Sequence, residues 1–458
     1  MDFNVHDSSG REVGIVENPA ESLWVRKYQK PGEFELYLPA TPAALALIME
    51  DCYITREDAP EVMIVEHVEI VTSQEDGDFL LVKGRGAEAL FERRIIWEQT
   101  AIAGRVDAAI YKLVQENAIS PADPARELPI TMQEHSLSGF DISWELGSIA
   151  TSTGLGNAST TRFRGADYIP IGNGLHITMA ETQRVHLYYY DAEYNYLGYS
   201  GWHSVTSYLI TANTYEGAAY IRMIFSYRDN STISNLAAAA ASVEVHHGIS
   251  AQYTGNNLLE TVQEICAAYG LGFRAVHDNA DNADVVPHIE LLEGVDRSEG
   301  QSKNSHVMFA TEYDNLMDST YVLDTSNYKN VVKVAGEGEG KARKSVTRGT
   351  ASGMHRRELF VDARDMSTNN GEISAEEYNA MLAARGAESI AEHTVMESFD
   401  GEIDTSNNFI LDADYTLGDI VTIENDYGIR KNVRIATIME SWDDTGYAAI
   451  PTFENVEV

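Results

Sequence analysis

The chain has 458 residues and a formal net charge of −38 at pH 7. Its length leaves room for about two to four domains. Its acidity argues against specific nucleic-acid binding, because phosphates are neutralised by clustered lysine and arginine. No run reaches the roughly 20 apolar residues of a membrane-spanning helix. The first residues, Met1-Asp2-Phe3-Asn4, lack the basic and apolar segments of a signal peptide, so we expect synthesis in a cytoplasm.

Residues 1–133 have mostly the pattern of β-strands. Phe34, Leu36 and Leu38 alternate with polar residues and tyrosine after a Pro-Gly turn, and the segments 63–71 and 79–82 resemble further strands. A short helix is expected over residues 87–94. A clear amphipathic helix follows, with apolar residues at helical spacing from Val106 to Val114.

The composition changes at about residue 134. Residues 134–248 contain no lysine but 11 of the 24 tyrosines, and short apolar runs alternate with segments rich in Ser, Thr, Gly and Asn. Several short strands separated by turn signals predict an all-β sandwich. Residues 237–241, an alanine run, are expected to form a loop or one helical turn.

Aromatic residues are densest between residues 188 and 202. Alternation places Tyr188 and Tyr190 on one face of a strand and Tyr189 on the other. Four further aromatic residues fall in an Asp-, Asn- and Gly-rich stretch that we expect to be a loop: Tyr194, Tyr196, Tyr199 and Trp202. Exposed aromatic rings on loops suit apolar sugar faces or a protein surface, so these four are the candidate glycan-binding residues. The alternative is that they pack the edge of the sandwich.

The earlier character returns after residue 248. Leu258, Val262, Ile265 and Tyr269 lie on one face of a helix, and Gly270 stands where a C-terminal capping glycine belongs. This helix and the strand after it, residues 272–276, are expected to pair with the helix that begins near Val106. The sequence therefore predicts three parts: residues 1–133 and 249–458 form a host, and residues 134–248 form a sandwich inserted into it.

The last third combines one long helix with a closing β-meander. Ser374 and Glu377 form a capping box, which predicts a helix to about residue 392. Residues 420–424 and 433–440 alternate as half-buried strands, and a third strand is expected to end at Pro451. We expect this meander to bury one face in its own domain and to lend its edges to a ring.

Three motifs suggest chemistry but have simpler interpretations. Residues 84–89 partly match a dinucleotide-binding loop, yet the strand before them belongs to an antiparallel hairpin. The glycine-rich residues 336–341 lack the spacing of a phosphate-binding loop. Asp278–Asp284 lacks the spacing and glycine of a calcium-binding loop, which favours a solvated hairpin tip.

The sequence predicts no metal site and no cofactor. The two cysteines, Cys52 and Cys266, stand beside apolar residues and are expected to be buried free thiols. The 13 histidines form no His-Glu-x-x-His pair. Carboxylate pairs for glycoside hydrolysis depend on distance in space, so the 71 acidic residues leave that chemistry open.

The host resembles the siphovirus gene-product-37-like tail family. The resemblance rests on stretches that occur in order over the host: residues 24–28, 32–39, 257–260, 328–334, 357–364 and 415–423. It implies β-barrel hub domains and a smaller α/β domain, arranged as a homotrimeric ring at the tail tip. It also implies distal tail, tail-tube and receptor-binding or fibre proteins as partners, and no catalytic residues. The sandwich itself resembles jelly-roll carbohydrate-binding modules at residues 168–171, 185–191 and 219–224.

Our first hypothesis is therefore a non-enzymatic virion structural protein, made in a bacterial cytoplasm and placed at the tail tip or baseplate hub of a siphovirus or tail-like particle. It would close the tail tube and connect it to host-attachment parts, with the sandwich contacting host-surface glycan. The alternative is a carbohydrate-binding or glycan-degrading protein in which the sandwich is the working part. The fold class expected in both cases is mainly β with α+β parts.

Overall fold

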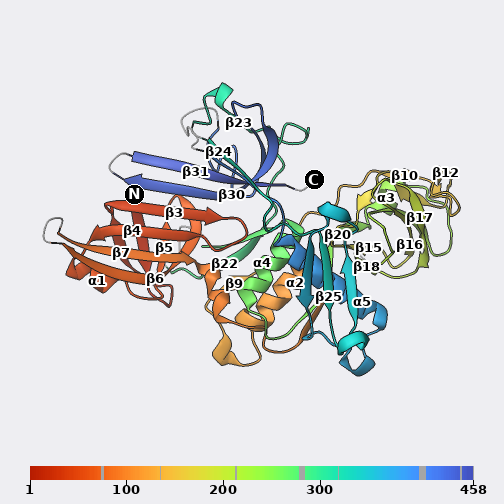
Figure 1. Ribbon diagram of the computed structural model, residues 1–458, viewed down its shortest axis with the longest axis horizontal. Helices are drawn as coiled ribbons and strands as arrows, with labels where there is room; N and C mark the ends of the chain where they lie inside the picture. The colour runs from red at the N-terminus through yellow and green to blue at the C-terminus, as the bar shows by residue number, and fades with distance from the viewer. Residues whose placement is uncertain are drawn as a thin grey trace.

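The computed structural model describes residues 1–73, 77–134, 136–211, 214–277, 284–317, 319–401, 409–443 and 446–456. The expected hairpin tip at Asp278–Asp284 lies outside the described residues, except for its last member. The fold is mainly β with α+β parts, as predicted. Figure 1 shows an elongated molecule, with the N-terminal sheet at one end, a mixed α/β region in the middle and the residue 134–248 segment at the other end.

Seven N-terminal strands form a curved half-barrel. Their order is β2-β1-β5-β6-β7-β4-β3. One face of this sheet carries a hydrophobic core in which Phe3, Trp24, Phe34 and Leu80 are buried. The bounds are β1 (Asp2–His6), β2 (Glu12–Glu17), β3 (Glu21–Lys27), β4 (Glu33–Pro39), β5 (Tyr53–Arg56), β6 (Ala59–Ser73) and β7 (Gly77–Gly86), with helix α1 (Pro42–Leu47) between β4 and β5.

The closing meander extends this N-terminal sheet. β29 (Ile420–Glu424), β30 (Arg430–Asp443) and β31 (Gly446–Asn455) form the expected antiparallel meander. β30 also pairs with β3, so Trp24 lies opposite Glu440. β31 pairs with β28 (Met396–Gly401), which pairs with β24 (Ser319–Asp324), and β29 pairs with β23 (Met308–Ala310).

One expectation about the meander was wrong. The third strand does not end at Pro451, because its proline lies opposite Ile438 within a strand that continues to Asn455. Strand β30 pairs with β3, β23 lies along part of β29, and β28 pairs with residues 452–454 of β31. The contribution of the meander edges to a ring stays a prediction. The first and last parts of the chain therefore build one sheet.

The middle region is the α/β part of the host. Helix α2 (Val106–Val114), helix α4 (Leu258–Tyr269) and strand β21 (Gly272–Val276) share one hydrophobic core, as the sequence predicted. Gly270 has φ 66°, which is the left-handed conformation expected of a capping glycine. The other elements here are η1 (Ala87–Arg93), β8 (Thr100–Arg105), the π-helix η2 (Gln115–Ile119), η3 (Pro124–Arg126), β9 (Thr131–Met132) and β22 (His288–Leu292).

A smaller α/β unit packs beside this core. β26 (Ser345–Arg348), β25 (Val331–Ala335) and β27 (Glu358–Asp362) form a three-stranded sheet against helix α5 (Ala375–Ala391). The Ser374 side chain accepts a hydrogen bond from the Glu377 backbone N–H at 3.1 Å, which confirms the predicted N-cap. Short turns of helix complete the region: η4 (Thr311–Tyr313), η5 (Gly340–Ala342), η6 (Gly353–His355) and η7 (Asn369–Gly371).

The segment around residues 134–248 contains two sheets that face each other. One sheet has the order β10-β13-β19-β16-β17, with β14 also on β19, and the other has the order β18-β15-β20-β8. Apolar side chains such as Leu175, Leu187 and Met223 fill the space between them. The bounds are β10 (Trp144–Leu146), β11 (Ser148–Ile149), β12 (Gly156–Asn157), β13 (Phe163–Gly165), β14 (Ile169–Pro170), β15 (Gly174–Thr178), β16 (Gln183–Tyr190), β17 (Tyr196–His203), β18 (Ser207–Thr211), β19 (Tyr220–Tyr227), α3 (Leu236–Ala240) and β20 (Glu244–Tyr253).

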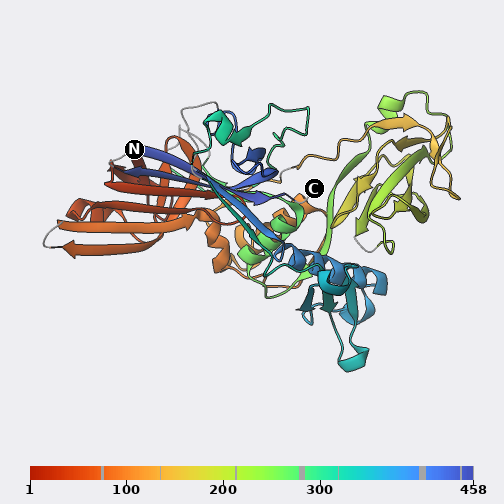
Figure 2. The same ribbon diagram turned by 45° about the horizontal axis from the view of Figure 1, so that its top comes forward.

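One strand joins this sandwich to the host. The first residues of β20 pair with β15 of the sandwich, and its last six residues pair with β8 of the host. Arg348 of the small α/β unit donates a hydrogen bond to the Gly172 carbonyl at 3.1 Å, and Lys303 of the host forms an ion pair with Asp141 at 2.5 Å. Figure 2 shows the sandwich as a separate lobe reached through β20. The exact domain boundaries at residues 134 and 248 stay a prediction.

Candidate functional site: the aromatic face of the sandwich

The outer face of the β16–β19 sheet carries most of the aromatic residues that the sequence singled out. Strand β16 points Val185, Leu187 and Tyr189 into the sandwich core. Its alternate residues Tyr188 and Tyr190 belong to a separate cluster on the other face. The predicted alternation of the three consecutive tyrosines is therefore confirmed. We call this outer surface the aromatic face; it comprises His186, Tyr188, Tyr190, Tyr196, Tyr199 and Trp202.

The expected loop from Tyr194 to Trp202 was wrong over most of its length. Tyr196, Tyr199 and Trp202 lie on strand β17, opposite Tyr190, Tyr188 and His186. A regular strand places every second residue on one face. The pairing register shifts at two points, and each shift adds one residue to β17. These irregularities explain how residues three apart reach the same face, and they carry no clear sequence signal in a stretch rich in Gly and Asn.

The four predicted site residues are not brought together as one group. The rings of Tyr199 and Trp202 both contact the His186 ring, with centroid distances of 5.3 and 5.1 Å. Tyr196 contacts Tyr188 and Tyr190. Tyr194 is in a turn with φ 63°. Its ring stacks on Tyr220 at 4.6 Å and contacts Tyr168 at 4.9 Å, at the other end of the face.

A short segment covers the middle of the aromatic face. This covering segment, residues 147–157, contains the β11–β12 pair. Tyr188, Tyr190 and Tyr196 donate hydrogen bonds from their hydroxyls to its carbonyls, each at 2.7 Å. Burial of the Tyr188 and Tyr190 rings raises the pKa of both phenols to about 12. These three tyrosines therefore hold a loop in place. Tyr199 is 49% exposed, and the half-buried Trp202 beside it packs against the cluster that contains Ile149. We call this end of the face, which makes none of the three hydroxyl bonds, the uncovered end.

Two arginines that the sequence analysis missed lie against Trp202. The guanidinium carbon of Arg184 is 4.5 Å from the Trp202 ring centroid, and that of Arg162 is 5.3 Å away. Arg184 could have been found, because alternation along β16 places it on the same face as His186. Arg162 could not, because no pattern connects the start of β13 with β17. The uncovered end therefore combines aromatic rings with positive charge.

His186 lies beneath this end of the face. Its side chain is 4% exposed, and neither ring nitrogen has a hydrogen-bond partner among the described residues. Burial, with a smaller contribution from the nearby Arg162 charge, lowers the pKa of His186 to about 4. The imidazole is therefore neutral at pH 7 and packs as an aromatic ring between Tyr188, Tyr199 and Trp202.

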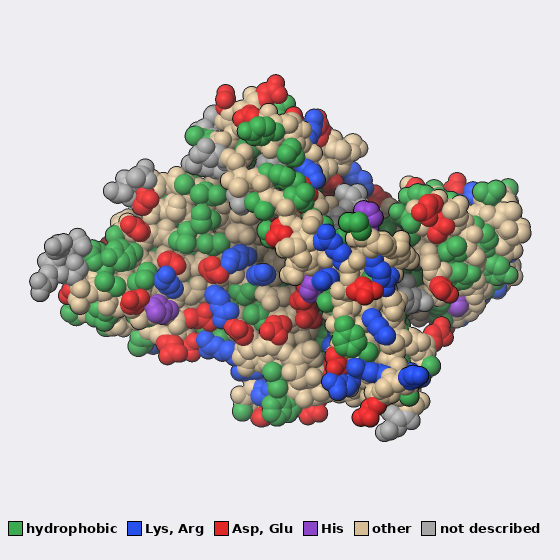
Figure 3. Space-filling view, in the orientation of Figure 1, with side chains coloured by type: hydrophobic (Ala, Val, Ile, Leu, Met, Phe, Trp, Pro, Cys, Tyr) green, Lys and Arg blue, Asp and Glu red, His purple; other side chains and the backbone are tan. Residues whose placement is uncertain are grey.

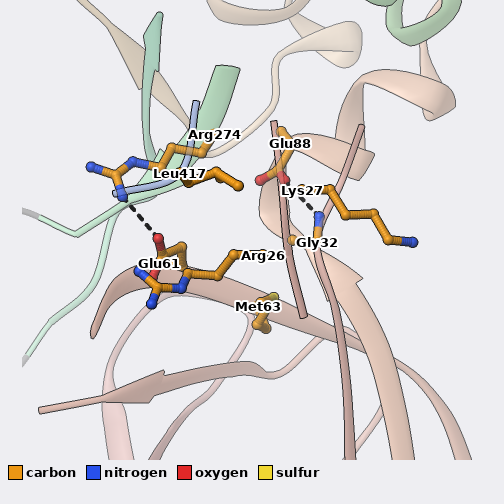
Figure 4. Close-up of a pocket in the computed structure, with 9 residues that line it drawn as sticks. Arg26, Lys27, Gly32, Glu61, Met63, Glu88, Arg274 and Leu417 are labelled. Carbon is orange, nitrogen blue, oxygen red and sulfur yellow. Dashed lines mark hydrogen bonds and ion pairs between the residues drawn. The ribbon is translucent and has the colours of Figure 1, made fainter. Parts of the chain in front are cut away.

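A second cluster of charged residues lies where the half-barrel meets the α/β part (Figure 4). Glu88 is buried, and its carboxylate accepts hydrogen bonds from the backbone N–H groups of Gly32 and Ala275 at 3.2 and 3.0 Å. Burial raises the pKa of Glu88 to about 7. Glu61 forms an ion pair with Arg274 at 2.8 Å. The cavity between these residues has a volume of about 10 Å³, which is space for one water molecule rather than a substrate.

Other candidate chemistry has a structural explanation. Strand β7, which precedes residues 84–89, pairs antiparallel with β4 and β6, so the dinucleotide-loop interpretation is excluded. Cys52 and Cys266 are buried free thiols, as predicted. Over the described ranges, we find no cluster of three metal-ligating side chains and no helix with the length and hydropathy of a membrane span. On the face shown in Figure 3, Lys and Arg side chains gather over the central part of the molecule.

Comparison with known proteins connects the host to one family. The family model described as "Siphovirus ReqiPepy6 Gp37-like protein" matches residues 2–144 and 224–453. The unmatched residues 145–223 include the aromatic face. No curated protein matches the chain significantly.

Solved structures with similarity to the chain include three tail proteins. The 43 kDa tail protein of prophage MuSo2 from Shewanella oneidensis has 9% identity and a TM-score of 0.45, over 99% of this chain and 98% of that one. Prophage tail protein gp18 from Listeria monocytogenes EGD-e has 9% identity and a TM-score of 0.43, over 100% and 95%. The tail protein from Neisseria meningitidis MC58 has 10% identity and a TM-score of 0.45, over 99% and 96%.

Proposed function

The chain belongs to the Siphovirus ReqiPepy6 Gp37-like protein family, and we propose from this premise that it is a structural protein at the tail tip of a phage or tail-like particle. It acts as the baseplate hub, closes the tail tube and connects the tube to host-attachment parts. The observation that carries the proposal is the family match on both sides of residues 145–223, because it covers the half-barrel, the α/β part and the closing meander.

The construction of the host supports a mechanical role. Strands β3 and β30 join the two ends of the chain in one sheet, and buried ion pairs between Arg26, Arg56 and Glu440 cross the junction. A unit held this way resists separation of its N- and C-terminal parts. The net charge of −38 suits a tube end through which DNA passes without being retained.

The assembly proposed for this hub is a homotrimer that contacts distal tail and tail-tube proteins on one side and receptor-binding or fibre proteins on the other. Sedimentation of the purified chain, alone and with the tail-tube protein of the same particle, tests this. We expect a trimer or a trimer formed on addition of the tube protein. A chain that stays monomeric at high concentration and does not associate with the tube protein contradicts the hub assignment.

The sandwich is proposed to be an inserted module, residues 134–248, that contacts host-surface glycan and has no enzymatic activity. The uncovered end of the aromatic face supports this, because exposed aromatic rings bind the apolar faces of sugars. The full chain should bind at least one polysaccharide from the host cell wall in a panel and release no reducing ends from it. Turnover of a polysaccharide would instead favour the alternative of a glycan-degrading protein.

A further inference from the structure

We propose that the uncovered end of the aromatic face binds a negatively charged saccharide, with Arg162 and Arg184 holding its anionic group and Tyr199 stacking on its sugar ring. The inference rests on the proposed glycan-contacting role of the sandwich and specifies the chemical class of its ligand. The group recognised is a carboxylate or a phosphate carried on a sugar or polyol chain.

The outer face of the β16–β19 sheet carries four arginines, and two of them lack a carboxylate partner among the described residues. Arg164 and Arg222 both lie near Glu145, with N–O distances of 2.7 and 3.9 Å. Within the described part of the chain, Arg162 and Arg184 take part in no ion pair. Arg162 donates a hydrogen bond to the Ser148 hydroxyl at 2.9 Å, and Arg184 donates to Ser226 at 3.0 Å and to Asn230. The uncovered end is therefore positive although the chain as a whole has a net charge of −38.

The geometry around Trp202 carries the second step. The guanidinium carbons of Arg162 and Arg184 both lie within 5.3 Å of the Trp202 ring centroid. The indole ring and the hydrogen bonds to Ser148, Ser226 and Asn230 fix the positions of the two guanidinium groups. A fixed, planar guanidinium forms charge-assisted hydrogen bonds with carboxylate or phosphate at little entropic cost. In this proposal Trp202 is therefore a positioning residue for the two arginines.

Tyr199 supplies the stacking surface. Its side chain is 49% exposed, and its ring lies on the same face as Trp202 and against His186. The buried His186 has two unpartnered ring nitrogens, so the floor of this end offers an aromatic ring and no negative charge. The covering segment accepts hydrogen bonds from the hydroxyls of Tyr188, Tyr190 and Tyr196 and so occupies their part of the face. The ligand is therefore confined to the end that carries Tyr199 and Trp202.

Binding measurements with three probes on the full chain test the inference. The probes are an oligogalacturonate for carboxylate, a poly(glycerol phosphate) oligomer for phosphate and a neutral oligogalactan of the same length. We expect one of the anionic probes to bind at least ~10-fold more tightly than the neutral probe, because each well-placed guanidinium adds a charge-assisted hydrogen bond. Affinity should fall as salt is raised from ~20 to ~300 mM.

Variants separate this site from general charge attraction. Arg162→Gln/Arg184→Gln should lower anionic affinity by about tenfold or more, whereas Arg364→Gln, which removes a 70% exposed arginine on the host, should leave it unchanged. The Arg162→Lys/Arg184→Lys variant keeps both positive charges and should retain part of the affinity for the anionic probe. Its remaining affinity shows that substitution at these two positions does not unfold the site. Tyr199→Ala should weaken all saccharide binding.

The outcomes distinguish this inference from the proposed function. Neutral and anionic probes that bind equally, or an Arg162→Gln/Arg184→Gln variant with unchanged affinity and salt dependence, would overturn the anionic class while leaving glycan contact intact. No binding of any of the three probes at millimolar concentration would overturn both this inference and the glycan-contacting role. Neither result bears on the hub assignment, which is tested by assembly.

Discussion

Arg56 of strand β5 donates a hydrogen bond to Glu440 of strand β30 at 3.2 Å, and their side chains are 2% and 4% exposed. This pair joins the half-barrel to the closing meander across 384 residues of sequence. Arg26 lies on the other side of the same carboxylate, and the Tyr447 hydroxyl donates to it at 3.2 Å. Each guanidinium group also pairs with a more exposed carboxylate, Arg26 with Asp412 at 2.9 Å and Arg56 with Asp58 at 3.0 Å. Glu440 is therefore the buried carboxylate that both guanidinium groups share where the ends of the chain meet.

Replacing this carboxylate should weaken the junction strongly. Glu440→Gln removes the negative charge while keeping the shape, and it leaves Arg56 paired only with Asp58 and Arg26 only with Asp412, both of which are more exposed than Glu440. Loss of the partner of a buried charge costs about 3–5 kcal/mol when nothing else compensates that charge. Asp412 and Asp58 offset part of this cost, so we expect about 2–3 kcal/mol, seen as a lower Tm in thermal unfolding. Glu33→Gln, at the exposed ion pair with Lys27, is the control and should cost less than about 1 kcal/mol. Equal, small effects of the two substitutions would contradict the role assigned to the junction.

Glu88 should make stability depend on pH. Burial raises the pKa of Glu88 in the folded state to about 7, from its ordinary value of 4.5. Between these two pH values the carboxyl group is protonated in the folded state and ionised in the unfolded state. The stabilisation is therefore complete below pH ~4.5 and is lost as the pH rises through ~7, a change of about 3 kcal/mol.

The Glu88→Gln variant isolates this effect. Urea unfolding at several pH values between 4.5 and 8 should show a smaller decline in the free energy of unfolding for the variant than for the parent chain. Some decline remains, because burial also raises the pKa of Glu264 to about 7 and of Glu388 to about 6. A variant whose pH profile runs parallel to that of the parent would rule out a protonated Glu88 in the fold.

The covering segment should loosen when its tyrosine hydroxyls are removed. Tyr188→Phe/Tyr190→Phe keeps both rings and deletes two hydrogen bonds to the carbonyls of Ile149 and Gly154. Each deletion leaves a carbonyl without its partner at a cost of about 1 kcal/mol. Limited proteolysis should cleave within residues 147–157 faster than in the parent. Tyr199→Phe, on the same face but outside this contact, is the control and should leave the cleavage rate unchanged. A Tyr188→Phe/Tyr190→Phe variant as resistant to proteolysis as the parent would show that these hydroxyls do not hold the covering segment.

The strand that joins sandwich to host should tolerate no side chain at Gly248. An added Cβ would lie 2.6 Å from the Leu175 carbonyl carbon and 2.7 Å from the His176 nitrogen, and both are backbone atoms that cannot move alone. Gly248→Ala should destabilise the β15–β20 pairing by about 1–3 kcal/mol, measured as faster amide exchange in those strands. Gly300→Ala is the matched control, because the atom nearest to its added Cβ is 4.0 Å away. Amide exchange in β15 and β20 as slow in Gly248→Ala as in this control would contradict the prediction.

Local patterns predicted the elements whose signals are local. The α4 helix with its Gly270 cap, the Ser374 cap of α5 and the Tyr188–Tyr190 alternation follow from spacing and turn chemistry within a few residues. The closing meander was also predicted, because its strands follow one another along the chain. Local patterns could not show which distant strand completes each sheet, so the pairing of β30 with β3 was missed.

The candidate site was predicted in part for the same reason. Its aromatic residues were visible as a composition signal, but the register shifts in β17 and the covering segment decide which rings remain exposed. Arg162 reaches Trp202 only because β13, β19, β16 and β17 lie side by side in one sheet. The predicted set Tyr194, Tyr196, Tyr199 and Trp202 therefore omitted the arginines that lie beside Trp202, and its ligand-binding role stays a prediction.

Immunogold electron microscopy of particles from a bacterium that carries this chain tests the hub proposal most directly. With an antibody against the half-barrel, residues 1–86, we expect label at the distal end of the tail on intact particles, and mass spectrometry of those particles should contain the chain. Particles that are complete and infectious without the chain, or label confined to the supernatant, would contradict the account.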